Sequence, residues 1–242
     1  MKIVPWAAVL ACFARVAVAA DANDCKLASE RVATAPLAGI ESVRIDAEAG
    51  DLHVNGVANA PSIDARGKAC ASNDKLIEEI KLEYEVEGTT LRISAKTPGG
   101  GVFRGFGRSQ YATLDLTVTL PSNLPVKVID TSGDLEVGGV RGLDLKDSSG
   151  DILVHNIAQN VVIDDDSGDL TVTDVTGNVT LKDGSGDIKV QRVGGKVTVT
   201  SDGSGDIDVD EVDHGLAVLL DGSGEINFSR VHGSIEIPAR NH

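Results

Sequence analysis

The sequence predicts an all-β fold: a parallel β-helix or β-roll with coils of about 18 residues and an antiparallel β insertion near the N-terminus. Three observations favour it. A motif of the form Asp-x-Ser-Gly-[Asp/Glu] recurs six times, with serines at 132, 149, 167, 185, 204 and 223. Aliphatic residues repeat in step with this motif, without helical periodicity. Aromatic residues make up only 3% of the 242 residues while glycines number 27, which favours aliphatic strands joined by tight turns.

Residues 1–20 have the pattern of a cleaved export signal rather than of a folded element. A basic start at Lys2 precedes a short apolar run, and the small residues of 17–20 permit cleavage after Ala19 or Ala20. An alternative interpretation is a lipoprotein box that would anchor the chain through Cys12. No later stretch reaches the roughly 18 apolar residues of a membrane span. We therefore expect an exported protein, in the periplasm, with a surface or lipid-anchored location as the alternative.

Two cysteines remain after the signal, Cys25 and Cys70. An even pair in an exported chain predicts a disulfide, which here would close a loop of about 45 residues. A redox or metal pair is the alternative, but the chain has neither a Cys-x-x-Cys motif nor clustered histidines.

Residues 21–66 form an N-terminal segment that holds a first, degenerate coil, and residues 67–125 are expected to be an inserted, β-rich capping segment. The degenerate coil has Ala49 at the position of the motif serine. Its matching aliphatic residues are Val43, Ile45, Leu52, Val54 and Val57. Within the insertion we expect a helix that Ser72 caps and that extends to Ile80. Alternating residues predict strands over 81–87, 90–96 and 113–120.

Residues 126–242 form the regular solenoid. Counted from the motif serine, positions +3, +5, +8, +12 and +14 are aliphatic; after Ser167 these are Leu170, Val172, Val175, Val179 and Leu181. Aliphatic residues two apart indicate a strand with one buried face, so each coil contains two short strands. The Ser-Gly pair forms one corner and a glycine at +10 the other. A single coil buries too little apolar surface to fold, so we expect only the stacked array to be stable.

The repeat, Ser-Gly-Asp-[Ile/Leu]-x-Val with an intervening Gly-x-Val-x-[Val/Leu], resembles bacterial β-strand repeat domains described as candidate adhesins or as domains of unknown function. The resemblance covers residues 40–240. It implies an exported β-solenoid of the cell envelope, and it brings no catalytic residues with it.

The acidic residues of the motif form two columns, which neighbouring coils would stack at about 4.8 Å. One interpretation is local: each Asp side chain accepts the backbone N–H two residues on, forming an Asx-turn. The other is a bound cation, calcium above all, because the motif is similar to calcium-binding β-roll repeats. We favour the turn and expect no cofactor. The first column is Asp130, Asp147, Asp165, Asp183, Asp202 and Asp221, and the second is Asp134, Asp151, Asp169, Asp187, Asp206 and Glu225.

A Gly-rich stretch over 98–111 holds two arginines and three of the few aromatic residues of the chain. Because both types are favoured at contact surfaces, it is a candidate binding loop, and a flexible hairpin tip is the alternative. Its candidate residues are Phe103, Arg104, Phe106, Arg108 and Tyr111.

The function that these patterns favour is a non-catalytic, adhesin-like binding or scaffolding protein. A net charge of −15 argues against nucleic acid and anionic membranes as partners. The five histidines are scattered, and neither a Gly-x-Ser-x-Gly nor a His-Glu-x-x-His motif occurs. We expect no enzymatic activity and an envelope or surface partner, protein or glycan. A calcium-binding β-roll and a carbohydrate-active β-helix enzyme are the alternatives.

Overall fold

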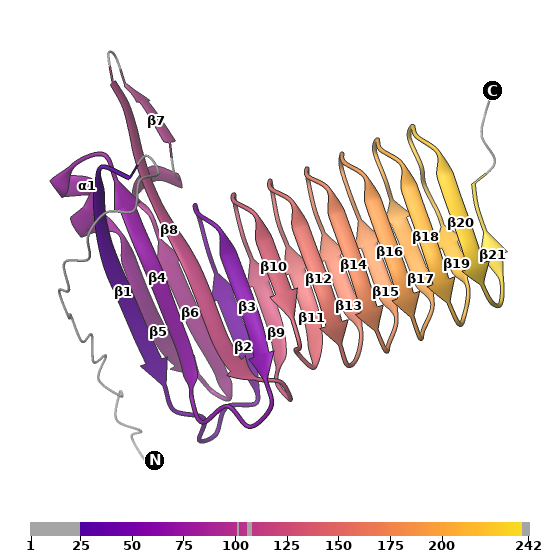
Figure 1. Cartoon of the computed structure of the whole chain (residues 1–242), viewed down its shortest axis with the longest axis horizontal. Coiled ribbons are helices and arrows are strands. Elements are labelled where there is room, and N and C mark those ends of the chain that lie inside the picture. The colour runs from indigo at the N-terminus through magenta and orange to yellow at the C-terminus, as the bar shows by residue number, and fades with distance from the viewer. Residues whose placement is uncertain (1–24, 101, 106–107, 239–242) are drawn as a thin grey trace, which may run out of the picture.

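The computed structural model describes residues 25–100, 102–105 and 108–238, which form two long sheets facing each other along a rod (Figure 1). The first sheet contains, in spatial order, β1 (Leu27–Ala35), β4 (Ile63–Ala71), β8 (Arg108–Pro121), β3 (Leu52–Val57), β10 (Leu135–Gly138), β12 (Ile152–Ile157), β14 (Leu170–Val175), β16 (Ile188–Val193), β18 (Ile207–Val212) and β20 (Ile226–Val231), with β7 (Val102–Gly105) paired to β8.

The second sheet runs alongside the first. Its strands are, in spatial order, β21 (Ile235–Glu236), β19 (Leu216–Val218), β17 (Val197–Ser201), β15 (Val179–Lys182), β13 (Val161–Asp164), β11 (Gly142–Lys146), β9 (Pro125–Ile129), β2 (Ser42–Asp46), β6 (Thr90–Lys96) and β5 (Lys81–Glu87). The short helix α1 (Asp74–Glu79) and a 3₁₀ turn at Pro98–Gly100 lie near the N-terminal end.

The β-solenoid prediction is confirmed, because each coil gives one strand to each sheet and successive coils pair in parallel. The register joins equivalent repeat positions: Leu170 pairs with Ile188, which pairs with Ile207 in the next coil. The aliphatic columns at these positions are buried between the sheets. Burial on both sides by neighbouring coils is what stabilises strands this short.

A bend within the first-sheet strands β12, β14, β16, β18 and β20 was not expected from the sequence. The residue at +7 adopts the left-handed conformation, which is uncommon for residues other than glycine. It interrupts the alternation of the strand, so that the aliphatic residue at +8 turns inward and is buried. The residues concerned are Asn156, Asp174, Arg192, Glu211 and Arg230, with φ between 50° and 57°.

The N-terminal part extends both sheets beyond the regular coils. Strand β8 pairs in parallel with β3, and β6 pairs in parallel with β2. Strands β4 and β5 then add antiparallel neighbours, and β1 adds an antiparallel edge to β4. Strands β5 and β6 have the expected bounds, 81–87 and 90–96.

Three details differ from the sequence-based expectations. The helix begins after Asn73, not Ser72, because the Asn73 side chain accepts the backbone N–H of Leu76 at 3.1 Å. Val57 is 45% exposed, since this degenerate coil does not turn its +8 residue inward. Strands β1 and β4 were not expected. Their Ala-, Ser- and Arg-rich sequences carry little of the β-branched signal that marks strands.

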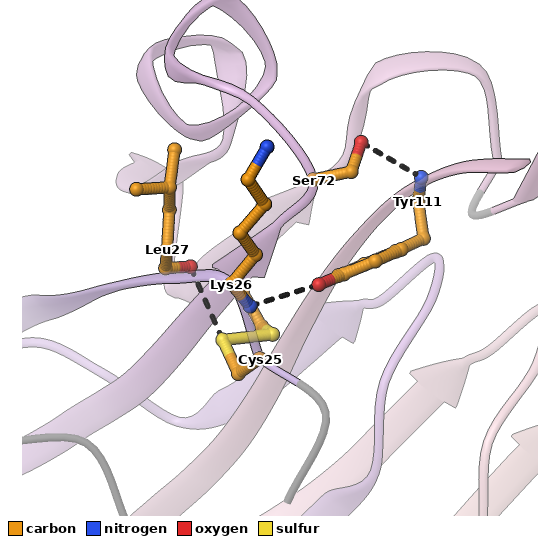
Figure 2. Close-up of a disulfide and its surroundings, with 6 residues drawn as sticks. Cys25, Lys26, Leu27, Ser72 and Tyr111 are labelled. Atoms are coloured by element: carbon orange, nitrogen blue, oxygen red, sulfur yellow. Dashed lines mark hydrogen bonds between the residues drawn. A yellow bond between two sulfur atoms is a disulfide. The ribbon is translucent and has the colours of Figure 1, made fainter. Parts of the chain in front are cut away.

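The predicted disulfide is present: Cys25 and Cys70 are joined with an S–S distance of 2.07 Å. Cys70 lies on β4, and Cys25 lies just before β1, the edge strand that pairs with it. The bond therefore fastens the start of the described chain to the sheet (Figure 2).

Candidate functional site

The second acidic column links each coil to the next. In each pair of neighbours, Oδ1 of one aspartate accepts the backbone N–H of the acidic residue that follows it in the column. The distances run from 3.1 Å, for Asp51 to Asp134, down to 2.8 Å, for Asp206 to Glu225. The Asx-turn interpretation is therefore wrong for this column, because its side chains reach the adjacent coil instead of their own turn.

The first acidic column lies inside the solenoid. Asp130, Asp147, Asp165, Asp183 and Asp202 are at most 3% exposed. At Asp165, Oδ1 accepts the N–H of Ser167 at 3.3 Å, which is a hydrogen bond of the Asx type. Burial raises the pKa of Asp130 and Asp183 to about 7 and that of Asp165 and Asp202 to about 6.

The Ser-Gly pair lies between the two columns along the chain. The first column is buried except at the half-buried Asp221, and the second column is exposed. Across the described ranges, no group of three or more His, Cys, Asp or Glu side chains is arranged to hold a metal ion.

A cluster that the sequence analysis missed lies on the outer face of β3, β10 and β12. Glu136 lies between two histidines: its Oε2 is 3.2 Å from Nδ1 of His53, and its Oε1 is 3.1 Å from Nε2 of His155. The Asn156 amide lies 2.9 Å from Nδ1 of His155. Hydrogen bonds, first from His155 and then from His53, hold the pKa of Glu136 below its usual value.

Room for the imidazole of His155 comes from Gly138, where a Cβ atom would lie 2.2 Å from Cε1 of that ring. The sequence pattern could have predicted this cluster, because the register of neighbouring coils brings its residues together. His53 and Glu136 share repeat position +4, and His155 lies at +6 one coil later. Following the outward-facing positions from coil to coil, as well as the aliphatic ones, would have found the cluster.

The candidate binding loop is a hairpin formed by β7 and β8, and it projects from the body of the rod (Figure 1). Phe103 and Arg104 lie on β7, and Arg108 begins β8. Phe106 is outside the described residues.

Tyr111 lies at the base of this hairpin and has a structural role. Its hydroxyl oxygen accepts the backbone N–H of Lys26 at 2.9 Å, and its own N–H donates to Oγ of Ser72 at 3.3 Å. Figure 2 shows these bonds beside the disulfide. The hairpin is thus connected at its base to the disulfide-bonded edge of the sheet.

A surface hollow of about 490 Å³ lies between the chain near Leu37 and Ile40 and the segment 121–124. Its lining consists of apolar, Asn, Ser and Pro residues, and none of them titrates near neutral pH. It therefore offers no general acid or base.

Comparison with known proteins places these features in context. The model of the Toastrack DUF4097 family matches residues 70–240. No curated protein matches the chain. In the part of the chain that the structure describes, no helix is long and apolar enough to cross a membrane.

Several solved structures show similarity, among them the following three. A candidate cell adhesion protein from Clostridium sporogenes is 13% identical over 84% of this chain and 99% of that one, with a TM-score of 0.47. A candidate adhesin from Bacteroides fragilis is 15% identical over 87% and 97%, with a TM-score of 0.46. A candidate lipid-binding protein from Parabacteroides distasonis is 18% identical over 86% and 96%, with a TM-score of 0.39.

Proposed function

The chain belongs to the Toastrack DUF4097 family, and we propose that it is a non-catalytic, exported protein of the cell envelope. In this proposal the solenoid serves as a rigid scaffold, and the β7–β8 hairpin contacts an envelope or surface partner, protein or glycan.

The observation that carries the proposal is the way the motif residues are used. The buried positions hold aliphatic side chains, the glycines allow the coils to approach, and the second acidic column links coil to coil. Polar residues of the repeat thus hold the stack together. This use supports a scaffold rather than a reaction centre, which would need acid, base or nucleophile groups gathered in a cleft.

Export is supported by the disulfide between Cys25 and Cys70, since such bonds persist in oxidising compartments. The first of these cysteines follows closely on the small residues at which we expect signal cleavage. N-terminal sequencing of the mature protein tests this point: we expect it to begin at Ala20 or Asp21, and a mature start at an acylated Cys12 would indicate a lipid anchor instead.

The hairpin is the proposed contact element because it stands away from the rod and its strands include Phe103, Arg104 and Arg108, residue types that are favoured at binding interfaces (Figure 1). The net charge of −15 makes these arginines a local exception on an acidic protein, which favours a partner with acidic or aromatic groups.

Site-specific photo-crosslinking in cells that carry the gene tests the contact. A photoreactive residue at position 103 of the full-length protein is expected to give a discrete adduct in the envelope fraction. The same residue at position 189, on the exposed face of β16, is the matched control and is expected to give none. Equal labelling at both positions, or adducts at neither, would contradict the assignment of the hairpin.

The enzyme alternative has its own measurement. Purified protein is incubated with envelope polysaccharides, and the release of reducing ends is followed. Release above the background of a heat-denatured sample would replace the scaffold proposal with a carbohydrate-active one.

A further inference from the structure

The buried aspartates form a continuous column through the solenoid. The backbone N–H of each one donates to the carbonyl oxygen that precedes the next: Asp130 to Lys146 at 2.9 Å, Asp147 to Asp164 at 3.0 Å, and Asp183 to Ser201 at 2.9 Å. Asp202 pairs in the same way with Asp221 in a parallel bridge. Equivalent carboxyl groups therefore follow one another at the spacing of neighbouring strands, about 4.8 Å.

These carboxyl groups are buried away from water, and few hydrogen-bond donors lie near their oxygens. In the residues that the structure describes, neither oxygen of Asp130, Asp147, Asp183 or Asp202 has a hydrogen-bond partner, and neither does Oδ2 of Asp165. Ionised carboxylates in such a place are strongly disfavoured unless they are paired.

The charged groups that act on the column are also acidic. Asp51 acts on Asp130 from the preceding coil, and Asp166, which directly follows Asp165, acts on Asp147 and Asp165. Asp187 and Asp221 act on Asp202. The lysines next to the column face outward: the ammonium groups of Lys146 and Lys182 both pair with Asp164 on the outer surface.

We propose that this column is a proton-binding site, in which neighbouring carboxyl groups share protons along the solenoid. A protonated carboxyl group donates its O–H to an oxygen of the next carboxyl group, so the proton comes from solvent and no other ligand is required. The site extends from Asp130 to Asp202, within the stack of parallel coils.

Two further observations support the sharing of protons between neighbouring carboxyl groups. Asp183 and Asp202 act directly on each other, and two ionised carboxylates would repel, whereas a shared proton would join them. Burial, as the largest cause, raises the pKa of all five aspartates, to about 6 or 7 at four of them. A bound cation fits less well, because the backbone N–H groups of the next turn residues act on these carboxyl groups and would repel it.

The pKa shifts fix the direction of the pH effect. Folded values near 6 to 7 lie above the usual value of 3.8, so the folded state binds more protons than the unfolded chain. The stabilisation is fully present below about pH 4 and is lost as the pH rises through about 7. The solenoid is therefore expected to be more stable at pH 5 than at pH 8.

Infrared spectroscopy of the native full-length protein at pH 5.5 tests for protonated carboxyl groups. We expect the C=O stretch of buried COOH groups in wild type and a weaker band in Asp165→Asn/Asp183→Asn. Asn keeps the shape of the side chain and supplies its own N–H donor, so the stack is preserved. If the double variant does not fold, Asp130→Asn, at the end of the column beside Ala47, serves the same purpose.

Thermal unfolding between pH 5 and pH 8 is the second readout. The Tm of wild type is expected to fall by roughly 5–10 °C over this range, and that of the double variant by clearly less. Asp169→Asn, in the exposed column of the coil that contains Asp165, is the matched control and should keep the wild-type dependence, because Asp169 is not among the charges that act on the buried aspartates.

Two results would overturn the proposal. One is a wild type without a buried COOH band whose Tm slope with pH equals that of the double variant. The other is a Tm at pH 8 that rises on addition of millimolar calcium in wild type but not in the double variant, because the column would then bind a metal ion.

Discussion

The glycine of each Ser-Gly motif sets how closely the coils can approach. Gly186 has a φ of +139°, and a Cβ atom there would lie 2.0 Å from the carbonyl oxygen of Gly168 in the preceding coil. The same contact recurs at Gly168, Gly205 and Gly224. A side chain at this position would have to push two backbones apart, which explains why the motif keeps glycine while its second residue varies.

Substitution of this glycine is expected to be among the most damaging single changes in the protein. We predict that Gly186→Ala lowers the free energy of unfolding by about 2–5 kcal/mol, from backbone strain and overpacking together. Gly142→Ala is the matched control, because its added Cβ would lie 3.4 Å from the nearest atom, and we expect it to cost under about 1 kcal/mol. Urea denaturation of both variants measures this, and equal costs would contradict the close-approach argument.

The residue at +7 has a strained backbone conformation that the sequence does not predict. Glu211 has a φ of 56°, in a conformation that glycine adopts without penalty. We predict that Glu211→Gly is more stable than Glu211→Ala by about 1 kcal/mol. Both variants lose the exposed ion pair with Arg230, so their difference in chemical denaturation isolates the backbone effect. An alanine variant as stable as the glycine variant would show that the position is unstrained.

At the scale of elements, the exposed acidic column works by hydrogen bonding between coils rather than by charge. Oδ1 of Asp169 accepts the N–H of Asp187 at 3.0 Å. We predict that Asp169→Ala is less stable than Asp169→Asn by about 1 kcal/mol, because asparagine keeps the accepting oxygen. Asparagine also removes repulsion between stacked carboxylates, so Asp169→Asn is expected to equal or exceed wild type at low salt. Thermal unfolding at two salt concentrations checks the order, and it would be refuted if alanine and asparagine were equivalent.

The elements also show what a sequence can and cannot predict. The regular coils were predictable because one aliphatic pattern, repeated without interruption, has a single way to bury itself. The hairpin strands β5 and β6 were equally clear, since alternation at residues such as Leu91 and Ile93 gives one apolar face. Strands β1 and β4 gave little signal, because the alanines and polar residues in them become strands only through their neighbours. The left-handed bend at +7 left no signal, since the side chains there share neither size nor charge.

The candidate sites were harder to predict than the fold for a related reason. Burial of the first acidic column depends on where the corner lies relative to the sheets, and a repeat pattern does not specify this for Asp147 or Asp183. The pairing of Glu136 with His53 and His155 depends on side chains from three coils meeting on one face. Residues of the hairpin, such as Phe103, are marked by composition alone, so the sequence predicts their exposure but not a partner.

At the scale of the whole molecule, each coil is stable only because another covers it. Phe228 stands in the column of Val209, yet it is 44% exposed because β20 has a neighbouring strand on one side only. Val209, covered on both sides, is 2% exposed. An apolar side chain at one repeat position is thus buried or exposed according to where its coil lies in the stack. This is the behaviour of a one-dimensional array.

An array of this kind predicts that a whole coil can be removed but half a coil cannot. Deletion of residues 167–184 joins Asp166 to Ser185 and restores the motif with the next coil in register. We expect this variant to fold into a shorter rod with a lower Tm and a smaller urea m-value, because less surface is buried. Deletion of residues 176–184 removes only β15 and its corners, so the following strands would have to enter the wrong sheet; we expect it to unfold or aggregate. Circular dichroism and urea titration distinguish the two, and equal behaviour of the whole-coil and half-coil deletions would mean that stability does not arise from coil-to-coil contacts.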